Sequence, residues 1–134
     1  MANRHKSRIL AFQALYGWDM TGNDVEELFS FQWLKEEVEE DTLLYSKLII
    51  SGVLQNREQV DKTIADHLLK WDFDRLARVD LAILRISTYT LLFLKDVPSR
   101  VAINEAIEIA KDYAAPESYK FINGVLDGIA KTVL

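Results

Sequence analysis

The chain has 134 residues, of which 49% are apolar and 28% charged, a balance typical of one soluble globular domain over residues 1–134. It has no cysteine, which excludes disulfides and thiolate metal sites and fits a reducing cytoplasm. No apolar run is long enough to cross a membrane, and no apolar export signal follows the basic start MANRHKSR, so we expect a cytoplasmic protein without membrane contact.

Helical periodicity runs through every long segment, and no convincing strand pattern interrupts it. We therefore predict an all-α fold of about seven helices. Asn3 is predicted to cap the first helix and Gly22 to end it, because an amide suits a helix start and glycine suits the left-handed turn at its end. The predicted helices cover about residues 4–20, 24–35, 42–55, 57–69, 74–94, 101–113 and 117–130.

Glycine and proline mark positions where packing or chain direction changes. Gly52 lies inside a predicted helix and costs roughly 1 kcal/mol there relative to alanine, so close packing against another helix is expected. Pro98 stops the long fifth helix, and Pro116 breaks the chain between the last two helices. Trp71 lies in a short connection and is predicted to anchor the core.

Basic residues gather at the N-terminus of a chain whose net charge is −5. Arg4, Lys6 and Arg8 precede the first acidic residue, Asp19, and His5 lies among them. The other 13 of the 16 lysines and arginines share the rest of the chain with all 21 acidic residues. A basic end on an acidic body indicates a local contact with RNA phosphates, while the body repels non-specific binding. A solubilising terminus with a chance cluster is the alternative.

Arg4 and Arg8 are i,i+4 neighbours on the predicted first helix and would share a face. Like charges at that spacing, and cations at the positive end of the helix dipole, both disfavour the first turn. We expect that turn to be frayed in the free protein and ordered by an RNA backbone.

Several separated motifs occur along the chain. They are QALYGW at 13–18, RVDLAILRISTYTLLF at 78–93, DVP at 96–98, VAINEAIEIAK at 101–111 and SYKFINGVLD at 118–127. In order and spacing they resemble the NusB family of bacterial transcription antitermination factors, over nearly the whole chain. The resemblance implies a small all-helical protein with two packed halves, joined near residues 67–74. It also implies binding to the boxA element of nascent RNA together with NusE, which is also a small-subunit ribosomal protein.

The resemblance places RNA contacts on two segments. The first consists of Arg4, His5, Lys6 and Arg8. The second consists of Glu117, Lys120 and Phe121. Phe121 could stack on a base, as aromatic side chains do in single-strand recognition, although a phenylalanine at a helix edge also suits the core. Glu117 is acidic and would limit affinity.

The resemblance also places a partner surface for a NusE-like ribosomal protein on Tyr16 and Asp80. Asp80 is a polar residue within an apolar run. A local ion pair with its neighbour Arg78 is the alternative explanation. The implied assembly is an RNA polymerase antitermination complex, with this chain as a monomer or weak homodimer.

The sequence offers little for catalysis. His5 and His67 have no partner at metal-ligand spacing, the glycines are scattered, and Glu105 and Glu108 are expected to face water. We therefore expect no metal, no cofactor and no enzymatic activity, and interpret the chain as an adaptor in ribosomal RNA transcription. Two alternatives stay open: a NusB-like fragment of an RNA cytosine methyltransferase, and a helical module that binds only protein.

Overall fold

The computed structural model describes residues 2–22, 24–31, 34, 36–70 and 72–133, so the prediction for Trp71 lies outside the described residues. Within these ranges the secondary structure is helical and contains no strand, which confirms the predicted all-α fold. The helices are α1 (Arg4–Thr21), α2 (Val25–Ser30), α3 (Glu40–Gln55), α4 (Arg57–Asp66), α5 (Arg78–Phe93), α6 (Ser99–Tyr113) and α7 (Ser118–Val133), with a short 3-10 helix η1 (Phe73–Arg75) before α5.

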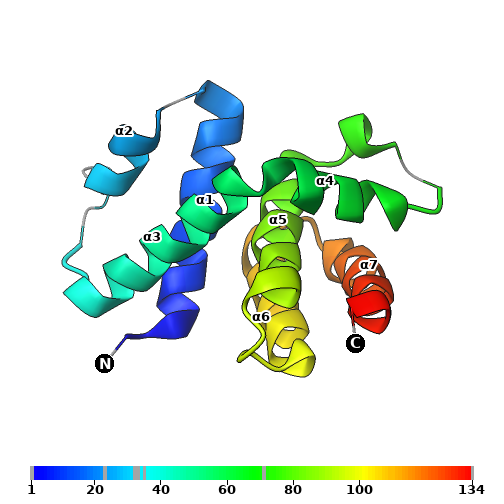
Figure 1. Cartoon of the computed structure of the whole chain (residues 1–134). Helices are drawn as coiled ribbons and strands as arrows, with labels where there is room; N and C mark the ends of the chain where they lie inside the picture. The colour runs from blue at the N-terminus through cyan, green and yellow to red at the C-terminus, as the bar shows by residue number, and fades with distance from the viewer. Residues whose placement is uncertain (1, 23, 32–33, 35, 71, 134) are drawn as a thin grey trace.

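Helix α5 lies at the centre of the fold. It packs against α1 and α3 on one side and against α4 and α7 on the other, as Figure 1 shows, and it also packs against α6. Because helices cover α5 on both sides, every residue from 80 to 91 is buried. A helix enclosed in this way has no polar face toward water. None of the described helices is both long and apolar enough to span a membrane.

The two helical halves meet at a different point from the one predicted. Helix α4 packs against α5 and α7, so it belongs with the C-terminal half. The chain therefore passes from one half to the other at Asn56, the single residue between α3 and α4, and not near residues 67–74. Asn56 allows this sharp change because its backbone N–H and its side-chain amide both donate to the carbonyl of Gly52, at 3.1 and 2.8 Å.

The ends of α1 follow the predicted chemistry. Asn3 Oδ1 accepts a hydrogen bond from the Lys6 backbone N–H at 3.0 Å, and Gly22 ends the helix with φ 73°. Two hydrogen bonds join this first turn to α3, which opposes the fraying expected from its charges. The Asn3 backbone N–H donates to Thr42 Oγ1 at 3.0 Å, and Ser7 Oγ donates to the Thr42 carbonyl at 2.7 Å.

Gly52 supports the close helix packing that was predicted for it. A Cβ atom at this position would lie 2.0 Å from Cζ of Tyr89, well inside contact distance. The Tyr89 ring also stacks on Phe93, with 5.3 Å between ring centroids. The absent side chain therefore allows α3 to approach α5 closely, which offsets the helix propensity lost at this glycine.

A buried ion-pair cluster connects the two halves. The Arg85 guanidinium donates from Nε and Nη2 to the two carboxylate oxygens of Asp61, at 2.9 and 3.0 Å. Its Nη1 also lies 4.0 Å from Asp19 Oδ1, and Arg78 Nη1 lies 3.4 Å from Asp19 Oδ2. The cluster thus joins α1, α4 and α5 through one arginine that is almost completely buried.

Candidate nucleic-acid and partner interface

Three of the four predicted N-terminal RNA contacts already have acidic neighbours. Lys6 Nζ pairs with Glu36, and His5 Nδ1 lies 2.5 Å from Glu105 Oε2. Arg8 is buried, and its Nη1 lies 3.5 Å from Glu105 Oε1. The expectation that Glu105 faces water is therefore wrong, because its carboxylate contacts both His5 and Arg8.

Arg4 differs from these residues in having an aromatic neighbour. Its guanidinium lies 4.7 Å from the centroid of the Tyr45 ring, and the side chain is exposed. Arg4 and Arg8 consequently do not share an exposed face, although they are one helical turn apart. Of the four basic residues, Arg4 is the one whose charge is most available to a phosphate.

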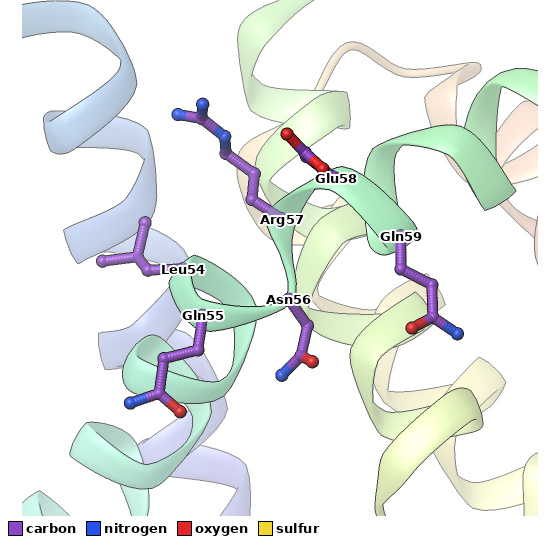
Figure 2. Close-up of a pocket in the computed structure, with 6 residues that line it drawn as sticks. All are labelled: Leu54, Gln55, Asn56, Arg57, Glu58 and Gln59. Atoms are coloured by element: carbon purple, nitrogen blue, oxygen red, sulfur yellow. The ribbon is translucent and has the colours of Figure 1, made fainter.

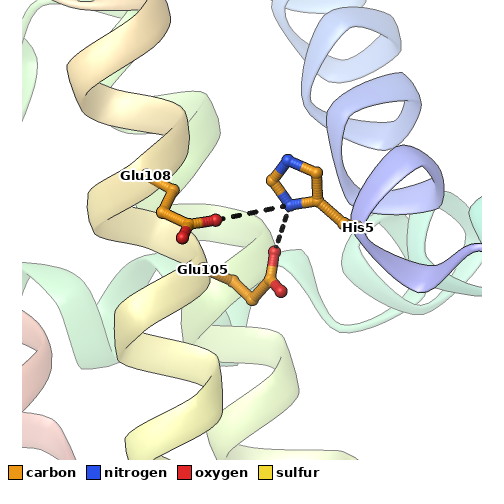
Figure 3. A group of neighbouring side chains, drawn as sticks. All are labelled: His5, Glu105 and Glu108. Carbon is orange, nitrogen blue, oxygen red and sulfur yellow. Dashed lines mark hydrogen bonds and ion pairs between the residues drawn. The ribbon is translucent and has the colours of Figure 1, made fainter.

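His5, Glu105 and Glu108 form the arrangement drawn in Figure 3. One ligand atom from each lies within 4.8 Å of the others, which could in principle hold a metal ion. The distances are those of an ion pair, because Nδ1 is at hydrogen-bond distance from Glu105 and 3.8 Å from Glu108 Oε2. We interpret the group as a contact that fixes the start of α1 on α6.

The second predicted RNA segment lies at the start of α7. Lys120 Nζ is 3.0 Å from Glu117 Oε2, and both side chains are largely exposed. Phe121 is half-buried and packs against the core. The structure places this segment near the C-terminal end of α6, where Lys111 Nζ lies 4.8 Å from the centroid of the Tyr119 ring.

Helix α6 connects the two candidate RNA segments. Its residue Glu105 contacts the start of α1, and its Tyr113 ring packs on Phe12 at 5.3 Å shortly before α7 begins. Eight residues of helix separate these points, or about 12 Å at 1.5 Å per residue. Helix α6 therefore contacts α1 at both points and leads directly into α7, which carries the second segment.

The predicted partner residues Tyr16 and Asp80 lie on α1 and α5, which the Arg78–Asp19 ion pair joins. Asp19 lies three residues after Tyr16, Arg78 lies two residues before Asp80, and these two charged residues pair at 3.4 Å. The alternative explanation for Asp80 is wrong, since Arg78 pairs with Asp19 instead. Asp80 is buried and accepts a hydrogen bond from Ser118 Oγ at 3.2 Å.

Burial raises the pKa of Asp80 above its ordinary value of 3.8, and the hydrogen bond from Ser118 opposes part of this rise. At pH values between the ordinary pKa of 3.8 and the raised pKa, Asp80 is protonated in the folded protein and ionised in the unfolded chain. Across that range the Asp80 contribution to stability falls as pH rises.

The variant Asp80→Asn should show this directly, because asparagine does not titrate. We expect the free energy of unfolding of the variant, minus that of the parent, to increase between pH 4 and pH 7. Denaturant unfolding at both pH values measures it. A difference independent of pH would contradict the raised pKa.

A hollow of about 480 Å³ at the turn between α3 and α4 carries no site. Its lining residues are Leu54, Gln55, Asn56, Arg57, Glu58 and Gln59. Figure 2 shows that these side chains point in different directions and do not converge on a common point. A binding site needs a few convergent polar groups, so we assign this hollow no function.

Comparison with known proteins identifies the family. The sequence model of the NusB family matches residues 5–131. The chain belongs to the NusB family. The transcription antitermination protein NusB of Treponema pallidum (strain Nichols) is 47% identical over 131 residues, covering 96% of this chain and 93% of the relative. This NusB-family assignment agrees with the fold.

Solved structures of NusB proteins share the architecture. T. maritima NusB has a TM-score of 0.88 and 39% identity, and the match covers 98% of this chain and 93% of that one. A structure of the antitermination factors NusB and NusE in complex with double-stranded RNA has a TM-score of 0.81 and 30% identity, covering 96% of each chain. Members of the NusB family have thus been observed with a protein partner and RNA together.

Proposed function

We propose that this chain is a transcription antitermination factor that binds boxA-type single-stranded RNA together with a NusE-like ribosomal protein. It would act without catalysis or cofactors, as a cytoplasmic adaptor that joins RNA to an RNA polymerase antitermination complex and promotes ribosomal RNA transcription. The observation that carries the RNA and partner roles is the nearly full-length match to a NusB chain whose structure contains both NusE and double-stranded RNA. The single-stranded boxA target is what the family resemblance implies.

The geometry supports weak RNA binding by the isolated protein. A phosphate can approach Arg4 directly, because its neighbour is an aromatic ring. To reach Lys6, a phosphate must displace Glu36, and Arg8 is buried against Glu105. Few cations are therefore available without rearrangement, and a partner that adds its own contacts would be needed for tight binding.

An electrophoretic mobility shift with boxA-type RNA against a scrambled sequence tests the proposal. We expect a preference for the boxA-type RNA, and loss of one phosphate contact in Arg4→Ala should reduce the logarithmic salt slope by about 0.7. Lys131→Ala is the matched control, because Lys131 is exposed at the far end of α7 and pairs with Asp127. Equal binding of both RNAs would contradict the proposal, and binding of neither would favour a module that binds only protein.

Replacing Glu117 by glutamine should strengthen RNA binding. The carboxylate repels phosphates and holds Lys120 Nζ at 3.0 Å, so its removal frees a cation and deletes a repulsion. Because both side chains are exposed, we expect a modest gain of about twofold to fivefold at low salt, shrinking as salt rises. Fluorescence anisotropy at two salt concentrations measures it, and a loss of affinity would show that Glu117 contacts the RNA favourably.

A further inference from the structure

Phe121 forms a wall between two hollows that differ in charge. One hollow, of about 370 Å³, is lined by Arg75, Leu76, Ala77, Asp80, Ala115, Glu117, Ser118 and Phe121. The other, of about 310 Å³, is lined by His67, Leu69, Lys70, Lys120, Phe121, Gly124 and Val125. The first contains two carboxylates, whereas the lining of the second contains lysines, a histidine and no carboxylate.

We propose that the second hollow, between residues 67–70 and α7, is a nucleotide subsite for the RNA strand that passes Phe121. This inference rests on the proposed function and extends it. A single strand that stacks one base on Phe121 must continue to one side of the ring. Charge complementarity selects the lysine-lined side, because a phosphate would meet Asp80 and Glu117 on the other.

Lys70 is the principal cation of this subsite. Lys120 Nζ is shared with Glu117, whereas Lys70 is exposed and has no ion-pair partner among the described residues. An exposed lysine without a partner binds a phosphate at little cost, since no existing contact must be broken. A strand that enters the hollow would therefore place a phosphate on Lys70.

The remaining walls suit a base and a sugar. Leu69 is 95% exposed, so its side chain can cover one face of a base when a ligand is present. Gly124 leaves the α7 side of the hollow open, with no atom within 4 Å of the position its Cβ would take. His67 Nδ1 lies 2.8 Å from the Thr63 carbonyl, which can only accept, so Nδ1 donates this bond and Nε2 is the ring nitrogen left for a ligand.

The subsite is tested by the affinity of boxA-type RNA for Lys70→Ala, Leu69→Ser and the control Lys131→Ala over a range of salt concentrations. We expect Lys70→Ala to reduce the logarithmic salt slope by about 0.7, the effect of one phosphate on a single strand. Leu69→Ser should weaken binding about threefold to tenfold with an unchanged slope. Lys131→Ala should change neither.

The outcomes separate this inference from the function on which it rests. A parent protein that binds no RNA overturns both. A parent that binds RNA, with Lys70→Ala and Leu69→Ser indistinguishable from it at every salt concentration, overturns the subsite alone. Because both residues are exposed, melting temperatures equal to that of the parent should accompany the expected losses.

Discussion

Arg85→Ala should lower the free energy of unfolding by about 3 kcal/mol, the largest effect on stability that we expect from the loss of one charged side chain. The side chain of Arg85 is 7% exposed and binds both oxygens of Asp61, whose own side chain is 21% exposed. Its removal leaves Asp61 and the neighbouring Asp19 as poorly solvated carboxylates without their shared cation. Denaturant unfolding monitored by circular dichroism measures the loss.

Two variants serve as controls for this prediction. Lys62→Ala breaks the exposed i,i+4 pair with Asp66 and should change stability by less than about 0.5 kcal/mol. Arg85→Lys keeps the positive charge but loses the bidentate hydrogen bond to Asp61. Its loss in free energy of unfolding should therefore lie between those of Arg85→Ala and Lys62→Ala. Equal effects of Arg85→Ala and Lys62→Ala would show that the buried cluster contributes little.

Phe121→Ala should weaken RNA binding by about 1–3 kcal/mol, roughly 5-fold to 150-fold, if a base stacks on this ring. The ring is half-buried against the core and borders both hollows at the start of α7, so the same substitution also removes packing. Fluorescence anisotropy with labelled RNA measures the affinity, and thermal unfolding measures the packing loss.

Phe121→Leu separates the two roles of this residue. Leucine keeps most of the apolar contact with the core but has no aromatic face. We expect Phe121→Leu to restore the melting temperature while leaving RNA affinity low. If Phe121→Leu bound RNA like the parent, and Phe121→Ala lost only stability, the ring would be a core residue and the stacking hypothesis would be wrong.

The features that the sequence predicted correctly depend on local chemistry. Asn3 and Gly22 bound α1 because capping involves only neighbouring backbone groups. Gly52 indicated a close helix contact because a glycine inside a helix has a local cost that calls for compensation. Local patterns could not name Tyr89 as the residue that fills the space, since it comes from another helix.

The features that the sequence missed depend on contacts between distant segments. His5 and Glu105 are 100 residues apart, and nothing in either segment indicates that they meet. The i,i+4 spacing predicts that Arg4 and Arg8 share a face, but packing of α1 on α3 and α5 buries Arg8 while Arg4 stays exposed. A lone arginine in the apolar run of α5 was the one available signal for the cluster around Arg85, because a buried arginine requires an acidic partner.

The proposed function implies that RNA and a NusE-like partner bind adjacent surfaces of this chain, and in that case each should strengthen binding of the other. Titration of boxA-type RNA into the protein, with and without a saturating NusE-like partner, tests it most directly. We expect the partner to raise RNA affinity by about 5-fold to 150-fold, a coupling of about 1–3 kcal/mol, and RNA to raise partner affinity by the same factor. Identical RNA affinities in the two titrations would mean independent sites and would contradict the cooperative adaptor.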